Sequence, residues 1–183
     1  MSWSRRSRED ADTSAEGARP ERVVDTGTFR ELMSGFPSGV AVVTTVDDDG
    51  APRGMTCTSL CSVGLRPPSL LVCLDDRSGT LSAVVSRAAF AVNLLHTRGR
   101  RAADLFGAPG PGRFADVDWE PVGPHGLPRL VSDAHATAAC RVVRTMPGGD
   151  HTVVLGAVEQ VIAAREPRPL LYGRRRYAQW PAS

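Results

Sequence analysis

The sequence predicts a small, predominantly antiparallel β-barrel with two or three short helices. Seven or eight short segments are rich in β-branched and other apolar residues, and turns containing glycine, proline or aspartate separate them. Helical patterns are few and short, so the chain lacks the repeating strand–helix alternation that indicates a parallel sheet. At 183 residues, the chain is long enough to bury the core of one such domain.

The first predicted element is a helix over residues 29–36. Thr28 and Glu31 fit a capping box. In this motif the hydroxyl accepts a hydrogen bond from an amide of the first turn, and the carboxylate three residues later accepts one from the amide of the capping residue. The apolar residues of this segment follow a helical spacing and share one face. Pro37 ends the helix, because proline cannot continue the backbone hydrogen bonding.

A strand hairpin follows this helix. Residues 39–47 form a continuous β-branched run, typical of a strand that is buried on both faces. A turn at residues 48–50 then predicts that residues 52–58 return as the partner strand. The other expected elements are strands over 69–74, 90–95, 134–145, 151–163, 170–172 and 176–179, helices over 78–85 (with Ser78 as the N-cap) and 98–106, and a loop with short extended pieces over 119–128.

Composition limits the domain organisation and the location. Residues 1–22 are charged and have no apolar periodicity, so we expect a disordered tail before a single domain over 23–183. The chain has no apolar run of about 20 residues and no apolar core of a secretory signal near its start, which predicts a cytoplasmic protein. The net charge of +2 favours neither nucleic acid nor a membrane as partner. All basic side chains are arginine, which excludes a Schiff-base or P-loop lysine.

Several common kinds of site are not indicated. The four cysteines have neither the spacing of a zinc site nor the density of a disulfide scaffold. Cys57 and Cys61 could form a redox pair. The alternative, which we expect, is that the cysteines are small buried thiols. The four histidines are scattered, so no metal site is expected. Residues 107–112 contain glycines, but not in the order of a dinucleotide-binding fingerprint, and nucleotide-loop, zinc-protease and serine-hydrolase motifs are missing from the sequence.

Residues 54–68 are dense in hydroxyls and small side chains and poor in charge. Because no bulky side chain blocks the approach, backbone amides and hydroxyls at this density can surround a planar ligand. The alternative is a strand end and loop whose hydroxyls bond only to local backbone groups.

Three further positions are candidates for chemistry, each with a plainer alternative. The segment 75–80 joins a strand to a helix start and is either a phosphate cradle or an ordinary capping loop. Asn93 stands among apolar strand residues and either contacts a ligand or satisfies core groups. His151 lies at a hairpin end, where a solvent-exposed histidine is the common case.

The order of these pieces resembles that of the short-chain flavin reductases that serve two-component flavin-dependent monooxygenases. The resemblance covers residues 29–180 and implies a split β-barrel of the type that binds flavin mononucleotide, and a homodimer. The motifs that carry it are Phe36-Pro37-Ser38-Gly39, Thr56-Cys57-Thr58-Ser59, Pro67-Pro68, Ser78-Gly79-Thr80, Phe90-Ala91-Val92-Asn93, Gly149-Asp150-His151 and Pro169-Leu170-Leu171-Tyr172.

The resemblance also implies a site. His151 is expected beside the nicotinamide as the catalytic position, and Ser78 and Thr80 at the flavin phosphate or ribityl chain. The flavin is FMN or FAD, the hydride donor is NADH or NADPH, and the recipient of reduced flavin is a monooxygenase. The residues expected to bind the flavin are Pro37, Ser38, Gly54, Met55, Thr56, Cys57, Thr58, Ser59, Ser62, Arg77, Ser78, Thr80, Asn93 and Phe106.

Two other functions remain open at this point. A non-enzymatic flavin carrier or store on the same barrel would need residues 56–62 but not His151. A protein similar to pyridoxamine-phosphate oxidases would need more basic phosphate ligands than the sequence places near Ser78.

Overall fold

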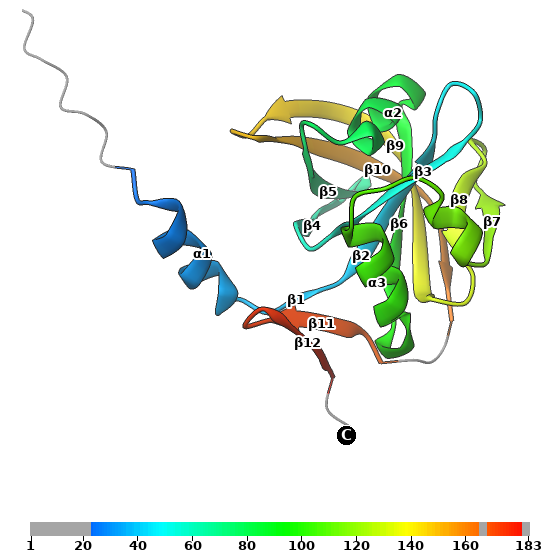
Figure 1. Cartoon of the computed structure of the whole chain (residues 1–183). Coiled ribbons are helices and arrows are strands. Elements are labelled where there is room, and N and C mark those ends of the chain that lie inside the picture. The colour runs from blue at the N-terminus through cyan, green and yellow to red at the C-terminus, as the bar shows by residue number, and fades with distance from the viewer. Residues whose placement is uncertain (1–22, 165–167, 181–183) are drawn as a thin grey trace, which may run out of the picture.

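The computed structural model describes residues 23–164 and 168–180, and the predicted tail over 1–22 lies outside them. Its central feature is a sheet of seven strands in the order β3-β2-β6-β9-β10-β5-β4, in which every neighbouring pair is antiparallel (Figure 1). These strands are β2 (Ala41–Val46), β3 (Pro52–Cys57), β4 (Leu60–Leu65), β5 (Pro68–Asp75), β6 (Ala89–Leu95), β9 (Ala134–Pro147) and β10 (His151–Ala163).

Smaller elements flank this sheet. They are α1 (Thr26–Ser34), α2 (Gly79–Arg87), α3 (Arg100–Gly107), the 3-10 turns η1 (Thr97–Gly99) and η2 (Arg113–Asp116), the hairpin β7 (Trp119–Val122) and β8 (Leu127–Leu130), and a three-stranded sheet of β1 (Ser38–Gly39), β11 (Leu170–Gly173) and β12 (Arg176–Gln179). The large sheet curls so that β3 approaches β5, where the Cys57 Sγ atom lies 3.8 Å from the Cys73 carbonyl oxygen. The prediction of a mainly antiparallel barrel with a few short helices is therefore confirmed.

The middle of the sheet is buried on both faces, which explains the uninterrupted β-branched run of β2. All six residues of β2 are buried. Val43 packs with Leu74 and Phe90 on one face, whereas Val42 packs with Leu95 and Phe106 on the other. Helix α2 covers the first face and helix α3 the second. Both helices are thereby fixed against the same strands, and their ends bound the cleft described below.

Local signals located most elements correctly. The turn before β3 forms with Gly50 at φ 79°, a conformation that glycine adopts without strain. Ser78 caps α2 as predicted, with its hydroxyl accepting a hydrogen bond from the Thr80 amide at 3.1 Å. The predicted cap of α1 is wrong, because Asp25 caps that helix and its carboxylate accepts from the Thr28 amide at 3.0 Å. The carboxylate competes better than the hydroxyl because it accepts from both the amide and the hydroxyl of Thr28.

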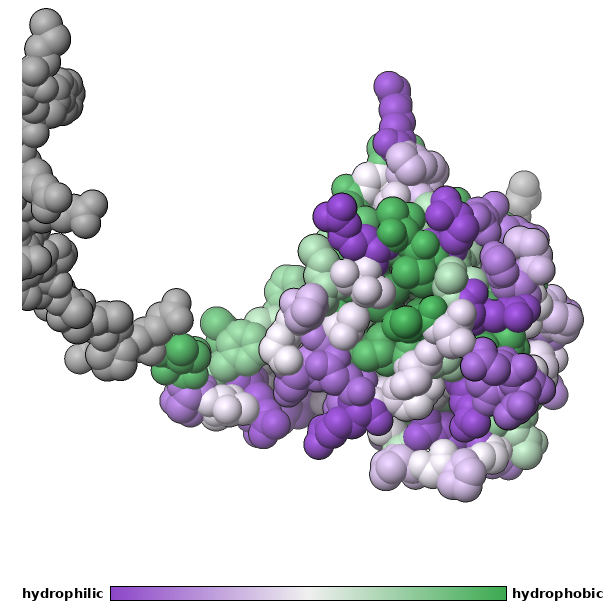
Figure 2. Space-filling model, turned by 90° about the horizontal axis from the view of Figure 1, so that it is seen from above, coloured by the Kyte–Doolittle hydropathy of each residue, from purple (hydrophilic) through white to green (hydrophobic). Residues whose placement is uncertain are grey.

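Helix α1 stands away from the barrel, and none of its residues is buried (Figure 1). Figure 2 shows apolar side chains along one side of this projecting segment and polar ones along the other. Its apolar face consists of Phe29, Leu32 and Met33, with Phe36 just beyond the helix; Leu32 is 70% exposed. No helix among the described residues is long and apolar enough to cross a membrane.

Candidate active site

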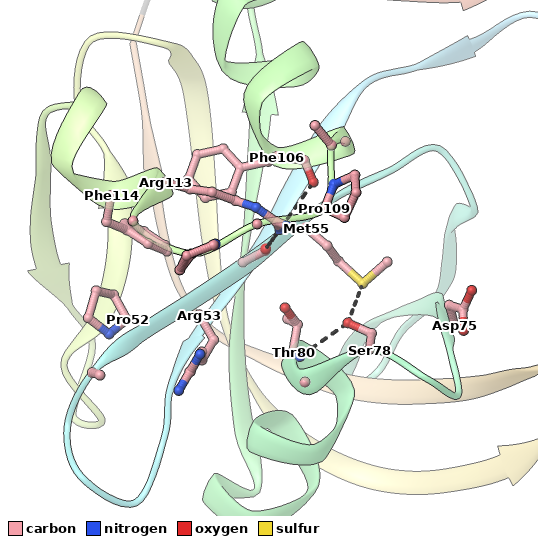
Figure 3. A pocket seen from close by; sticks show the side chains of 18 of the residues that line it. Pro52, Arg53, Met55, Asp75, Ser78, Thr80, Phe106, Pro109, Arg113 and Phe114 are labelled. Carbon is pink, nitrogen blue, oxygen red and sulfur yellow. Dashed lines mark hydrogen bonds between the residues drawn. The ribbon is translucent and has the colours of Figure 1, made fainter.

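Three segments that are distant in the sequence enclose a cleft of about 940 Å³. They are residues 51–55 on the hairpin of β2 and β3, residues 75–80 between β5 and α2, and residues 106–115 from the end of α3 into η2 (Figure 3). The volume lies at the upper end of the ~300–1,000 Å³ range of small-molecule and cofactor sites. Six predicted site residues line it: Gly54, Met55, Arg77, Ser78, Thr80 and Phe106.

The floor of the cleft depends on a glycine. A Cβ atom on Gly54 would lie 3.0 Å from Phe106 Cε1 and 3.2 Å from Phe114 Cζ, so a larger residue here would displace one of the rings. The two rings meet edge to face with their centroids 5.0 Å apart. Gly54 therefore lets an aromatic pair pack directly against β3 and form one apolar wall.

The opposite wall is the start of α2. The Ser78 hydroxyl donates to the Met55 Sδ atom at 3.3 Å, which holds this turn against β3 (Figure 3). Gly79 follows, and a Cβ atom there would have no neighbour within 4 Å. The first amides of a helix carry unsatisfied donors and a partial positive charge, so this wall favours an anionic group such as a phosphate.

The charges around the cleft are mostly paired. Arg77 donates to Asp75 through Nε at 3.2 Å and Nη2 at 3.0 Å, and these bonds lower the pKa of the Asp75 carboxyl to about 2. Asp75 is therefore ionised at any physiological pH and cannot serve as a general acid there. Arg53 pairs with Asp47 at 2.8 Å.

Arg113 differs from these two arginines. Its Nη1 atom donates to two backbone carbonyls, Gly54 O at 2.8 Å and Phe106 O at 3.5 Å. Sequence reasoning missed Arg113 and Phe114, because the preceding residues 107–112 were considered only as a failed dinucleotide motif. An arginine and a phenylalanine directly after a Gly/Pro-rich loop were the available signal.

His151 lies beside the cleft but not on its wall. It begins β10 opposite Asp75 of β5, and its Nδ1 atom lies 2.8 Å from the Asp150 carboxylate. This contact lowers the pKa of Asp150. The imidazole side chain is 39% exposed, so it remains accessible to a ligand that extends over Asp75.

Other predicted residues are placed outside the cleft. Thr56 donates to the Ala103 carbonyl at 2.7 Å and joins β3 to α3. Thr58, Ser59 and Ser62 are exposed at the edge of the sheet, and Pro37 and Ser38 lie beside β11. A ligand role for these residues stays a prediction.

The cysteines are free thiols in different environments. Cys57 is buried, which raises the pKa of its thiol to about 11. Cys61 is exposed on the edge strand β4, so the expectation of buried small thiols is wrong for this residue. Residues 61–65 of β4 are all exposed, because this strand lies at the end of the sheet, and no pattern in the sequence indicated an edge strand here.

Asn93 is fully buried and belongs to the core. Its Nδ2 atom donates to Val42 O, Thr44 Oγ1 and Pro128 O at 3.0–3.3 Å. Its Oδ1 atom accepts from Leu130 N and Thr137 Oγ1, each at 3.0 Å. The amide thus joins β6 to β2, β8 and β9, and the structure supports the core alternative over ligand contact at this position.

Comparison with known proteins identifies the family of the chain. Residues 33–181 match the model of the flavin reductase like domain. The chain is 52% identical to a flavin reductase (NADPH) of Lentzea aerocolonigenes over 88% of this chain and 94% of the relative. It is 37% identical to HsaB, the reductase subunit of a flavin-dependent monooxygenase of Mycobacterium tuberculosis, over 84% and 82% of the two chains.

A solved structure shows the same fold. The NADH:FAD oxidoreductase SgcE6 of Streptomyces globisporus, in complex with NAD and FAD fragments, superposes with a TM-score of 0.80 at 30% identity. The alignment covers 88% of this chain and 98% of SgcE6. The chain therefore belongs to the flavin reductase family.

Proposed function

We propose that this protein is an NAD(P)H:flavin oxidoreductase that reduces FMN or FAD in the cleft between β3, the start of α2 and residues 106–115. The observation that carries the proposal is the cleft itself, in which a glycine floor, an aromatic wall and a helix N-terminus face one another. A flavin nucleotide fits these surfaces, because it combines a flat ring with a phosphorylated chain.

The bound flavin supplies the redox chemistry by accepting a hydride from the nicotinamide. The protein then has to hold two flat rings within about 3–3.5 Å of each other and keep water away. Phe106 and Phe114 provide apolar surface for this, and the start of α2 at Ser78–Thr80 presents the positive end of the helix dipole to a phosphate. Hydride transfer requires no general acid, and the ionised Asp75 does not supply one.

We place His151 at the nicotinamide side of the site. Its position opposite Asp75 brings it to the edge of the cleft, and Asp150 orients its ring. The recipient of the reduced flavin is proposed to be a flavin-dependent monooxygenase, as the name of the similar subunit HsaB indicates for that protein. We assign the protein to the cytoplasm, since four free thiols suit a reducing compartment.

We further propose that the protein is a homodimer. The apolar face of α1 has no buried residue, and the edge strand β4 exposes Val63 and Leu65, the latter at 86%. Apolar surfaces of this kind mark interaction sites, and an edge strand is a template for pairing with another chain. A second copy of this chain supplies matching surfaces of both kinds.

Anaerobic stopped-flow measurement of flavin absorbance tests the activity. The purified protein is mixed with FMN or FAD and then with NADH or NADPH, and bleaching of the oxidised flavin is followed. Saturable, protein-dependent bleaching is expected with at least one donor. Flavin binding without bleaching by either donor would instead identify a carrier or store.

A further inference from the structure

Three guanidinium groups line the cleft, and two of them are neutralised by carboxylates. Arg53 pairs with Asp47, and Arg77 forms two bonds to Asp75. For Arg113, no carboxylate forms an ion pair among residues 23–164 and 168–180. Its two protein partners are uncharged carbonyls, so the positive charge of Arg113 remains available to a ligand.

The surroundings of Arg113 hold it at the cleft. Gly112 precedes it at φ 77° and turns the chain, and Phe114 follows it and packs edge to face against both Phe106 and Trp119. In Figure 3 the Arg113 side chain lies across β3, next to Phe106 and Met55. Both carbonyl bonds use Nη1, which leaves the donors of Nε and Nη2 for another partner.

The chemistry of this arrangement selects a class of ligand. A guanidinium is planar and matches two oxygens of one phosphate, and it is easier to desolvate than an ammonium group. Prior anchoring through Nη1 reduces the side-chain entropy that ligand binding would otherwise cost. The start of α2 across the cleft is a second favourable position for negative charge, so the cleft can receive a ligand with separated anionic groups.

We propose that Arg113 binds a phosphate group of the nucleotide that occupies the cleft and thereby sets which nucleotides the enzyme accepts. This proposal rests on the proposed function in so far as the ligand is a flavin or nicotinamide nucleotide. Both carry phosphate, and the two sources are separated by the experiment below.

The test compares Arg113→Gln and Arg113→Lys with the wild-type protein, and Arg141→Gln, at an exposed arginine of β9 that does not line the cleft, serves as the matched control. Binding of riboflavin, FMN and FAD is measured by fluorescence quenching without nicotinamide, and the KM values for NADH and NADPH are measured at saturating flavin. Riboflavin is the decisive probe, because it has the flavin ring and no phosphate. Thermal melting of each variant checks the fold.

If the phosphate belongs to the flavin, Arg113→Gln weakens FMN or FAD binding about 10- to 100-fold, the range of a charge-assisted hydrogen bond, and leaves riboflavin binding unchanged. If it belongs to the nicotinamide nucleotide, the same variant raises that KM by a similar factor while all flavin affinities stay constant. In either case Arg113→Lys recovers part of the loss, because it restores the charge without the planar fork. Arg141→Gln changes each quantity less than about twofold, since that exposed side chain lies outside the cleft and pairs with Glu159.

Two results would overturn the proposal. One is an unchanged affinity for every phosphorylated ligand in Arg113→Gln. The other is an equal loss for riboflavin and FMN that Arg113→Lys does not relieve, which would show that Arg113 only ties the loop to Gly54 and Phe106. The flavin-binding measurements need no reductase activity, and if the wild-type protein shows none, NADH and NADPH binding is titrated directly through nicotinamide fluorescence, so failure of the proposed function is recognised separately.

Discussion

At the scale of single residues, the site depends on small side chains as much as on reactive ones. Gly54 admits an aromatic pair to β3, and Gly79 leaves open space at the start of α2. The charged residues are mostly engaged with each other, as Asp75 and Arg77 are. The chemistry that remains for the protein is therefore positioning, which steric access and a few donors control.

Gly79→Leu tests the location of the ligand. A Cβ atom at this position would meet no protein atom within 4 Å, and Gly79 is helical, so the fold should tolerate the substitution or gain slightly in stability. Because Gly79 lines the cleft and a larger residue would occupy space there, we expect flavin affinity to fall at least about tenfold, or about 1.4 kcal/mol. Ser82→Leu, at an exposed position of the same helix that does not line the cleft, is the control and should bind normally. Equal affinities in a titration would place the flavin elsewhere.

His151→Ala tests the nicotinamide side. We expect slower hydride transfer and a higher KM for the nicotinamide, with kcat/KM reduced roughly three- to tenfold by loss of one hydrogen bond or stacking contact. Flavin affinity should stay the same, because the ring does not line the cleft. Steady-state kinetics with varied nicotinamide measures both effects, and His125→Ala provides a surface histidine as control. Wild-type kinetics in the His151 variant would remove this residue from the site.

At the scale of the elements, the sequence predicted the caps, turns and hairpins that depend on residues close together in the chain. The Ser78 cap, the Gly50 turn and the long hairpin of β9 and β10 are local, and the structure confirms them. Strand β4 was not predicted, because its own residues are mixed and exposed, and it is recognised as a strand by its pairing with β5, the one strand beside it in the described part of the chain. The cleft was predicted only in part. Its three segments are distant in sequence, and only tertiary packing brings residues 106–115, of which Phe106 alone was predicted, next to the other two segments.

Strand β9 contains a histidine, His135, whose protonation should make the stability of the fold depend on pH. Burial, reinforced by the positive charge that His96 can carry, lowers the pKa of His135 below its ordinary value of 6.5. The unfolded chain then binds this proton more readily than the folded one, so stability is complete above pH 6.5 and falls as the pH drops below it. We expect the melting temperature to decrease between about pH 7.5 and about pH 5.5, and to decrease less in His135→Gln. An identical decrease in wild type and variant would contradict this assignment; His125→Gln is the control.

At the scale of the whole molecule, the main feature is the apolar face of α1, which no other described part of the chain covers. Helix α1 contacts the turn between β11 and β12 through polar groups: Arg174 N donates to Ser34 O, and Arg175 pairs with Glu31 at 3.2 Å. Its apolar face points elsewhere and is open to solvent. The proposed dimer would cover this face.

Leu32→Glu tests the dimer. A charge in the centre of the apolar face should shift the protein toward the monomer, because burying an unpaired carboxylate is costly. Arg30→Glu introduces the same group at another exposed position of α1 and should leave the oligomeric state unchanged. Light scattering coupled to size-exclusion chromatography gives the mass of each protein. A monomeric wild type, or a fully dimeric Leu32→Glu variant, would be incompatible with the proposed role of α1.

Because the cleft is assembled from three segments that are distant in sequence, the concentration of its ligand affects how stable the folded protein is and how long it resists degradation. An unfolded chain cannot hold residues 51–55, 75–80 and 106–115 together, so a nucleotide that binds there binds the folded state alone. Mass action then adds free energy of unfolding that grows with ligand concentration, about 2.7 kcal/mol at one hundred times the dissociation constant. Proteases act on opened molecules, and the lifetime of the protein in the cell should follow the level of free flavin. A cell short of flavin would thus lose the enzyme that consumes reducing equivalents to reduce it.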